Sequence, residues 1–96
     1  MSRFARRVDD NHAAIVSALR QVGATVQSIA AVGAGAPDLL VGYRGTNWLF
    51  EVKDGAKVPS KQKLTPAERE WHERWRGHVT IVRTAADALA VLRVTP

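Results

Sequence analysis

A hairpin flanked by acidic residues constrains the fold of this 96-residue chain more than any other feature. Residues 39–50 run LLVGYRGTNWLF, which is two apolar runs joined by Arg44-Gly45. If the turn centres on Arg44-Gly45, antiparallel pairing places Asp38 directly opposite Glu51. Side chains alternate along a strand, so Lys53 projects from the same face as Glu51. The sequence therefore predicts two acids and one amine on one patch of a sheet.

This arrangement is energetically unfavourable unless something offsets the repulsion between the two acids. Directly opposed carboxylates approach to about 5 Å at Cβ and repel each other. A cation or a shared proton can offset the repulsion. Both hairpin strands carry apolar residues on both faces, which predicts a central position in a sheet that is covered from both sides. An acidic residue is out of place there as packing, so the pair indicates a functional site.

The charge of the chain points to a polyanionic partner. The net charge is +5 and the sequence pI is about 10.5, which favours nucleic acid. Basic residues flank the acidic patch in sequence, and we expect five of them to contact DNA phosphates: Arg6, Arg7, Lys57, Lys61 and Lys63. The alternative is that they are only solvated surface residues.

Two absences in the composition bound the class of protein. Cysteine is absent, which excludes disulfides and thiolate metal sites and favours a reducing cytoplasm. No apolar run approaches the roughly 20 residues that a membrane span needs. We therefore expect a cytoplasmic protein without a membrane partner.

The remaining patterns predict an α/β fold. We expect helices at about 9–22, from 66 to Gly77, and from 85 to about 92, and strands at 25–29, 38–42, 47–53 and 79–83. Residues 54–64 show no periodicity and predict a surface loop. Thr65 and Glu68 predict a capping box. Trp71 and Trp75 are predicted to be the buried side of the helix that follows, and the alternative is that they stack on nucleic-acid bases. The order predicts a mixed sheet of about four strands with helices on both faces.

The opposed carboxylates suit a hard divalent cation. Mg²⁺ binds through few protein oxygens and keeps several waters, and Mn²⁺ can substitute for it. Such an ion can hold a phosphodiester oxygen and activate a water. Lys53 beside it could position that water or stabilise the transition state.

An ordered series of motifs resembles the VRR-NUC branch of the PD-(D/E)XK nuclease superfamily. The motifs are GAPDLLVG at 35–42, LFEVKDG at 49–55, LTP at 64–66 and WRG at 75–77. That branch includes stand-alone phage and bacterial nucleases, and it resembles archaeal Holliday-junction resolvases. The resemblance covers nearly the whole chain. It implies that residues 1–96 form a single VRR-NUC-like domain with the three-layer restriction-endonuclease-like fold, in the order αβββαβα.

The resemblance also implies roles for the central residues. Asp38, Glu51 and the Val52 carbonyl would bind the metal, and Lys53 would be catalytic. The family further has an acidic residue on the first helix, for which Asp9 with Asn11 are the candidates.

Two of these assignments have alternatives. Asp9 and Asn11 could simply cap the first helix. The family usually has Gln on the helix after the loop, where this chain has Glu68. Glu68 could contact metal-bound water, or it could only close the capping box.

Two functions follow as hypotheses. The first is a metal-dependent DNA endonuclease of a bacterial or phage-infected cell, including structure-specific cleavage of branched, Holliday-junction-like DNA in repair or recombination. One chain carries one site, so cutting both strands predicts a homodimer. The second is a DNA-binding or assembly subunit of a phage or repair complex with weak or lost nuclease activity, which Glu68 favours.

Overall fold

The computed structural model of the protein describes residues 10–57 and 59–93, apart from the side chains of residues 10 and 61. Four α-helices lie in these ranges: α1 (Asp10–Gln21), α2 (Pro59–Gln62), α3 (Pro66–Arg74) and α4 (Ala85–Val91). The strands are β1 (Thr25–Ser28), β2 (Leu39–Tyr43), β3 (Thr46–Val52) and β4 (Thr80–Val82), and a 3₁₀ turn, η2, covers Ala30–Val32. None of the helices in the described residues is long and apolar enough to cross a membrane.

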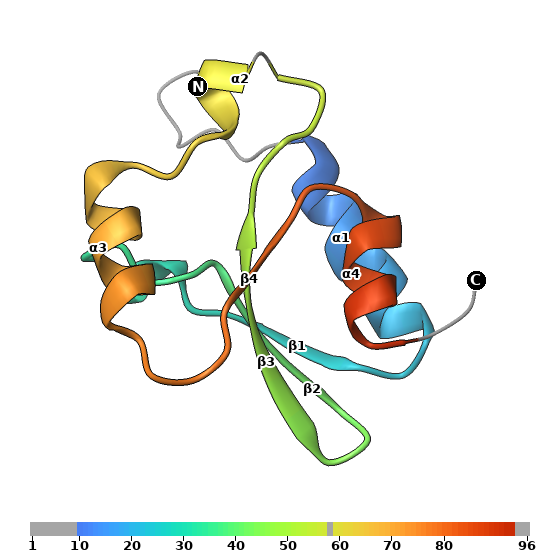
Figure 1. Cartoon of the computed structure of the whole chain (residues 1–96). Coiled ribbons are helices and arrows are strands. Elements are labelled where there is room, and N and C mark those ends of the chain that lie inside the picture. The colour runs from blue at the N-terminus through green and yellow to red at the C-terminus, as the bar shows by residue number, and fades with distance from the viewer. Residues whose placement is uncertain (1–9, 58, 94–96) are drawn as a thin grey trace.

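The strands form one mixed sheet between two helical layers. The strand order is β1-β2-β3-β4, with the first two pairs antiparallel and the β3–β4 pair parallel. The parallel connection requires a crossover, which passes through α2 and α3. α1 and α4 lie side by side on one side of the sheet, and α3 lies on the other (Figure 1). The predicted three-layer α/β fold is confirmed, whereas the prediction of a helix-free loop at 54–64 is wrong because α2 lies there.

The β2–β3 hairpin has the predicted register. Tyr43 pairs with Thr46, and Leu39 pairs with Phe50. The two-residue loop of Arg44 and Gly45 has φ values of 50° and 80°, as a type I′ turn requires at both central positions. A two-residue turn fixes the pairing along both strands, so Asp38, which directly precedes β2, lies close to Glu51, which directly follows Phe50.

The main core fills the space between the sheet and the α1–α4 layer. Ile15 and Leu19 of α1 are fully buried, as their helical spacing predicts. They belong to one buried cluster with Val41, Phe50 and Val82 from three strands. Burying each such side chain contributes about 1.5–3 kcal/mol, so this cluster holds the hairpin against α1 and α4.

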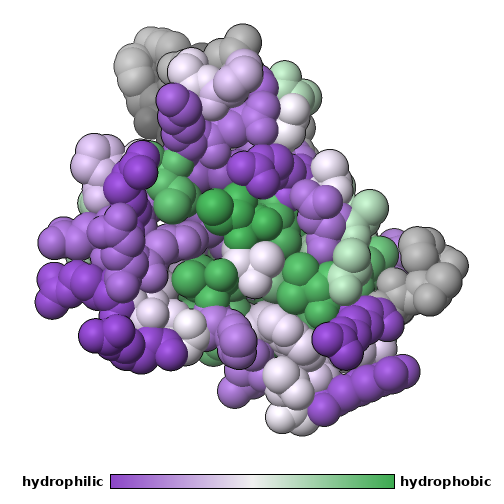
Figure 2. Space-filling view, in the orientation of Figure 1, coloured by the Kyte–Doolittle hydropathy of each residue, from purple (hydrophilic) through white to green (hydrophobic). Residues whose placement is uncertain are grey.

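α3 is only lightly packed. It contains no buried residue, Trp71 is half-buried, and Trp75 is 45% exposed. The prediction that Trp71 and Trp75 form a buried side is therefore wrong. The helix ends at Arg74, and Trp75 has extended backbone angles, so helical spacing no longer places its side chain. Figure 2 shows hydrophilic residues over the outer surface of α3, at the left of the view.

Candidate active site

Asp38 is held at the start of β2 by three hydrogen bonds. Its N–H donates to the Phe50 carbonyl at 3.0 Å, and its own carbonyl accepts from the Ile29 N–H at 2.9 Å. Its Oδ2 accepts from the Val52 N–H at 2.7 Å. The carboxylate is thus fixed across the β2–β3 pair, beside Glu51, as the hairpin register predicts.

Glu51 is a buried acid in the middle of the sheet. Its exposed fraction is 2%, and its Oε1 has no hydrogen-bond partner among the described residues. Burial, followed by the negative charges of Asp38 and Glu68, raises the pKa of Glu51 to about 9, while Lys53 opposes the shift. In the absence of a further cation, this environment therefore favours the protonated form of Glu51.

Lys53 lies between two of the carboxylates. Its Nζ is 2.8 Å from Glu68 Oε1 and 3.8 Å from Glu51 Oε2. Its side chain is 12% exposed, so these ion pairs are only partly screened by solvent. Glu51 and Glu68 therefore share a single ammonium group.

Glu68 closes the predicted capping box and also binds Lys53, whereas its contact with metal-bound water stays a prediction. Its Oε1 accepts from the Thr65 N–H at 2.9 Å as well as from Lys53, and the Thr65 hydroxyl accepts from the Glu68 N–H at 3.2 Å. Burial alone would raise the pKa of Glu68, but the hydrogen bonds from Lys53 and Thr65 outweigh it and lower that pKa. Glu68 is therefore an ionised partner that fixes the Lys53 ammonium.

Gly35 sets the position of the N-terminal end of α3. Its φ is +85°, in the left-handed region that favours glycine. A Cβ at Gly35 would collide with the Ala67 carbonyl and come within 3.0 Å of the Glu68 nitrogen. The loop before Asp38 thus packs directly on the first turn of α3, which brings Glu68 to Lys53.

The residues present fit a divalent cation. Glu51 lies beside Asp38 with one buried oxygen that lacks a partner, and the Lys53 ammonium is shared with Glu68, so a bound cation would stabilise the ionised form of Glu51. Across the described residues, no three His, Asp or Glu side chains converge closely enough to hold a metal by themselves. Asp38 and Glu51 would therefore supply two hard oxygen ligands and leave other positions to water or substrate, which suits Mg²⁺ or Mn²⁺.

Asn11 has a structural task in this region. Its Nδ2 donates to the carbonyls of Lys53 and Arg83, each at 2.8 Å, so it ties α1 to the ends of β3 and β4. Its Oδ1 is buried without a hydrogen-bond partner in the described part of the chain. Metal binding by Asn11 and by the Val52 carbonyl stays a prediction, and Asp9 lies outside the described residues.

The predicted DNA contacts are placed only in part. Lys57 and Lys63 are exposed. Lys61 lies in α2, and its side chain is outside the described part, as are Arg6 and Arg7 entirely.

Sequence reasoning missed two arginines near the carboxylates. Arg69 and Arg83 line an open groove of about 560 Å³ together with Lys63 and Ile81. Ile81 pairs with Glu51 across β3 and β4, so the groove adjoins the carboxylates. The sequence offered a signal only for Arg69, which directly follows Glu68, because the place of Arg83 depends on the pairing of β4 with β3.

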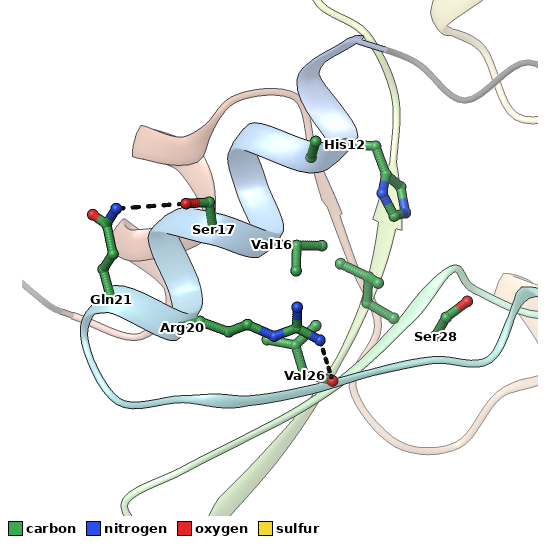
Figure 3. A pocket seen from close by; sticks show the side chains of 9 residues that line it. His12, Val16, Ser17, Arg20, Gln21, Val26 and Ser28 are labelled. Carbon is green, nitrogen blue, oxygen red and sulfur yellow. Dashed lines mark hydrogen bonds between the residues drawn. The ribbon is translucent and has the colours of Figure 1, made fainter.

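A larger groove lies elsewhere. It has a volume of about 640 Å³ and lies between α1 and β1, where His12, Val16 and Ser28 line it (Figure 3). Arg20 crosses it and donates to the Val26 carbonyl at 3.3 Å. Neither the carboxylates nor Lys53 line this groove, so the candidate active site is on the α3 side of the sheet.

Comparison with known proteins supports the family resemblance. No protein-family model matches the chain, and no curated protein matches it. A solved structure described as a VRR_NUC domain matches with 27% identity and a TM-score of 0.62, covering 86% of this chain and 95% of that one. The chain thus has the restriction-endonuclease-like fold of a VRR-NUC nuclease domain, and the resemblance seen in its sequence is confirmed.

Proposed function

We propose that the protein is a metal-dependent DNA endonuclease with Asp38, Glu51 and Lys53 as its catalytic residues. The observation that carries the proposal is Glu51, a buried carboxyl with an unpartnered oxygen beside Asp38 and Lys53. Burying a carboxyl group without a partner costs free energy, and a cation bound beside it would offset that cost. The likeness to a VRR_NUC domain supports phosphodiester hydrolysis as the reaction.

Each residue has a distinct role in the proposed reaction. Asp38 and Glu51 would hold Mg²⁺ or Mn²⁺, which when bound polarises a phosphodiester oxygen and activates a water. Lys53, held by Glu68 at 2.8 Å, presents a fixed positive charge next to this position. That charge stabilises the negative charge that develops on the phosphate in the transition state. Glu68 positions the Lys53 ammonium.

The substrate would approach over the cationic groove. Lys63, Arg69 and Arg83 line it beside Glu51, and phosphate contacts from such residues position DNA without reading its sequence. Structure-specific cleavage of branched DNA, a homodimer that cuts both strands, and a role in repair or recombination in a bacterial or phage-infected cytoplasm belong to the same proposal.

A cleavage panel tests the proposal. Four-way junction, linear duplex and single-stranded DNA are incubated with Mg²⁺, Mn²⁺ or EDTA, using wild type and Lys53→Ala. We expect cleavage of at least one substrate with metal, none with EDTA, and a loss of at least about a hundredfold in Lys53→Ala, in line with the contribution of a charge-stabilising group. Equal cleavage by both proteins would contradict the assignment of Lys53.

A DNA-binding or assembly subunit is the second candidate. The observation that favours it is the tight Lys53–Glu68 ion pair, because a carboxylate already neutralises the ammonium that catalysis would use. If the protein is such a subunit, it should bind the DNA substrates of this panel and cleave none of them. Metal-dependent cleavage that requires Lys53 would exclude it.

A further inference from the structure

Trp75 is a large exposed aromatic side chain close to the candidate active site. It is 45% exposed, and among the described residues only Val32 is another large apolar residue with such exposure. Exposing an indole to water forgoes the stabilisation that burial would give. A tryptophan left exposed beside a charged site therefore indicates a surface that binds a partner.

The exposed indole is held in place by Trp71. The two rings stack with centroids 4.6 Å apart and an interplanar angle of 17°. Stacking fixes the Trp75 ring before any ligand arrives, so binding against it costs less side-chain entropy. Trp71 lies one helical turn from Glu68, which contacts Lys53.

Trp75 forms one wall of a groove whose floor belongs to the active-site strands. The groove has a volume of about 280 Å³ and includes the neighbours Leu40 and Leu49. These two residues pair across β2 and β3, and each is two residues from Asp38 or Glu51 on its own strand. Alternate residues share a sheet face, so the groove continues the carboxylate face at a distance of about 7 Å.

The chemistry of the groove matches a nucleobase. The floor of Leu40 and Leu49 and the wall of Trp75 offer apolar and aromatic contact to a flat ring. Asn47 and His78 line the same groove and supply hydrogen-bonding groups for the polar edges of a base. A base within a duplex is stacked on both faces by its neighbours, so only an unpaired base can enter.

We propose that Trp75 is a stacking platform for an unpaired base next to the cleaved phosphate, so that the favoured substrates contain single-stranded nucleotides at the cut. The proposal rests on the proposed nuclease function and narrows its substrate class. Stacking of one base on an aromatic side chain is sequence-tolerant, because every base presents a π-face. The platform therefore selects for DNA structure and not for sequence.

Binding in EDTA tests the platform without cleavage. Fluorescence anisotropy of a labelled 12-nucleotide single strand and of a blunt duplex would be measured with wild type, Trp75→Ala, Trp75→Phe and Val32→Ala. We expect Trp75→Ala to weaken single-strand binding by about 5- to 150-fold, the range for one stacked base, and duplex binding by less than about twofold. Trp75→Phe keeps a stacking face and should stay within about threefold of wild type, as should Val32→Ala, which removes an exposed apolar side chain elsewhere.

An abasic substrate makes the test specific to stacking. A junction with one unpaired nucleotide is compared with the same junction carrying an abasic nucleotide there. We expect the abasic nucleotide to weaken DNA binding by wild type as much as Trp75→Ala does. It should not change DNA binding by Trp75→Ala, because both changes remove the same interaction. Independent effects of the two changes, or unchanged single-strand binding by Trp75→Ala, would overturn the proposal.

Two further outcomes distinguish the stacking platform from a dimer contact and from a failure of the proposed nuclease function. If Trp75 contacts a second copy of the chain, Trp75→Ala converts dimer to monomer in sedimentation while single-strand affinity is unchanged, which overturns the platform. Failure of the nuclease proposal would give a different result. Metal-dependent cleavage would be absent, while the affinities of the wild type and variants measured in EDTA would still follow the expected order. Thermal unfolding followed by circular dichroism confirms that each variant is folded.

Discussion

The Lys53 ammonium and the Glu68 carboxylate form a 2.8 Å hydrogen-bonded ion pair across the candidate active site. The same Glu68 oxygen accepts from the Thr65 N–H, so the cap of α3 and the placement of Lys53 depend on one atom. The stability of a surface helix is thereby coupled to the geometry of the proposed catalytic lysine.

This coupling predicts different effects for two capping variants. Thr65→Ala removes the hydroxyl that caps α3 but leaves the Lys53–Glu68 pair, whereas Glu68→Ala removes the carboxylate that accepts from both the Thr65 N–H and Lys53. Each should lower the free energy of unfolding by about 1 kcal/mol, as loss of a cap does. Only Glu68→Ala should also slow single-turnover cleavage, by roughly tenfold, which is 1.36 kcal/mol in the barrier. Equal cleavage rates in the two variants would show that Glu68 acts only as a cap.

The raised pKa of Glu51 predicts how stability depends on pH in the metal-free protein. The folded state keeps a proton to about pH 9 that the unfolded state releases near pH 4.5. Between these values the folded state binds more protons, so this group stabilises the fold most at low pH and the contribution is lost as pH rises towards 9. In urea unfolding from pH 5 to 9, wild type should lose more stability than Glu51→Gln. Parallel curves for the two proteins would contradict the shifted pKa.

Metal binding should reverse this pH dependence. Asp38 and Glu51 bind a cation only as carboxylates, so Mg²⁺ must displace the Glu51 proton. The increase in Tm caused by a fixed Mg²⁺ concentration should therefore be larger at pH 8.5 than at pH 6, and Glu51→Gln should show little increase at either pH. A Tm increase in Glu51→Gln equal to that of wild type would place the metal elsewhere.

Gly35 should be more sensitive to substitution than its neighbour Gly33. Both have positive φ, so alanine at either position is strained by about 1–3 kcal/mol. Only at Gly35 would the added Cβ meet the backbone of Ala67, whereas the corresponding space at Gly33 is open. Gly35→Ala should therefore lower Tm further than Gly33→Ala and also reduce cleavage, because α3 and Glu68 must move. Equal changes in both variants would mean that the loop does not position α3.

A substitution at Asn11 tests whether its side chain ties α1 to the ends of β3 and β4 or binds the metal. Asn11→Asp removes the two donors to the Lys53 and Arg83 carbonyls and faces them with a carboxylate, which should cost roughly 2–4 kcal/mol. Chemical denaturation should show this loss, while the Mg²⁺ affinity of the folded protein should stay within about threefold of wild type. A gain in Mg²⁺ affinity would instead assign Asn11 to the metal.

Much of the central site could be predicted from sequence because it depends on local rules. A two-residue turn at Arg44-Gly45 fixes the hairpin register, and strand alternation then places Asp38, Glu51 and Lys53 together. The capping box of Thr65 and Glu68 is equally local.

Other features depend on tertiary placement that no short pattern carries. The exposure of Trp75 follows from the end of α3 at Arg74, after which helical spacing no longer places the side chain. Arg69 and Arg83 lie far apart in sequence and meet only because β4 pairs with β3. The contact of Gly35 with Ala67 likewise requires the crossover to be in place.

Nicking of supercoiled circular DNA tests the central claim most directly. Wild type, Glu51→Gln and the hairpin-tip control Arg44→Ala are compared in Mg²⁺ and in EDTA. We predict Mg²⁺-dependent nicking by wild type and Arg44→Ala, and a rate at least about a hundredfold lower for Glu51→Gln, because the buried carboxylate holds the metal that stabilises the transition state. Nicking by Glu51→Gln at the wild-type rate, or nicking that persists in EDTA, would contradict the assignment of this site.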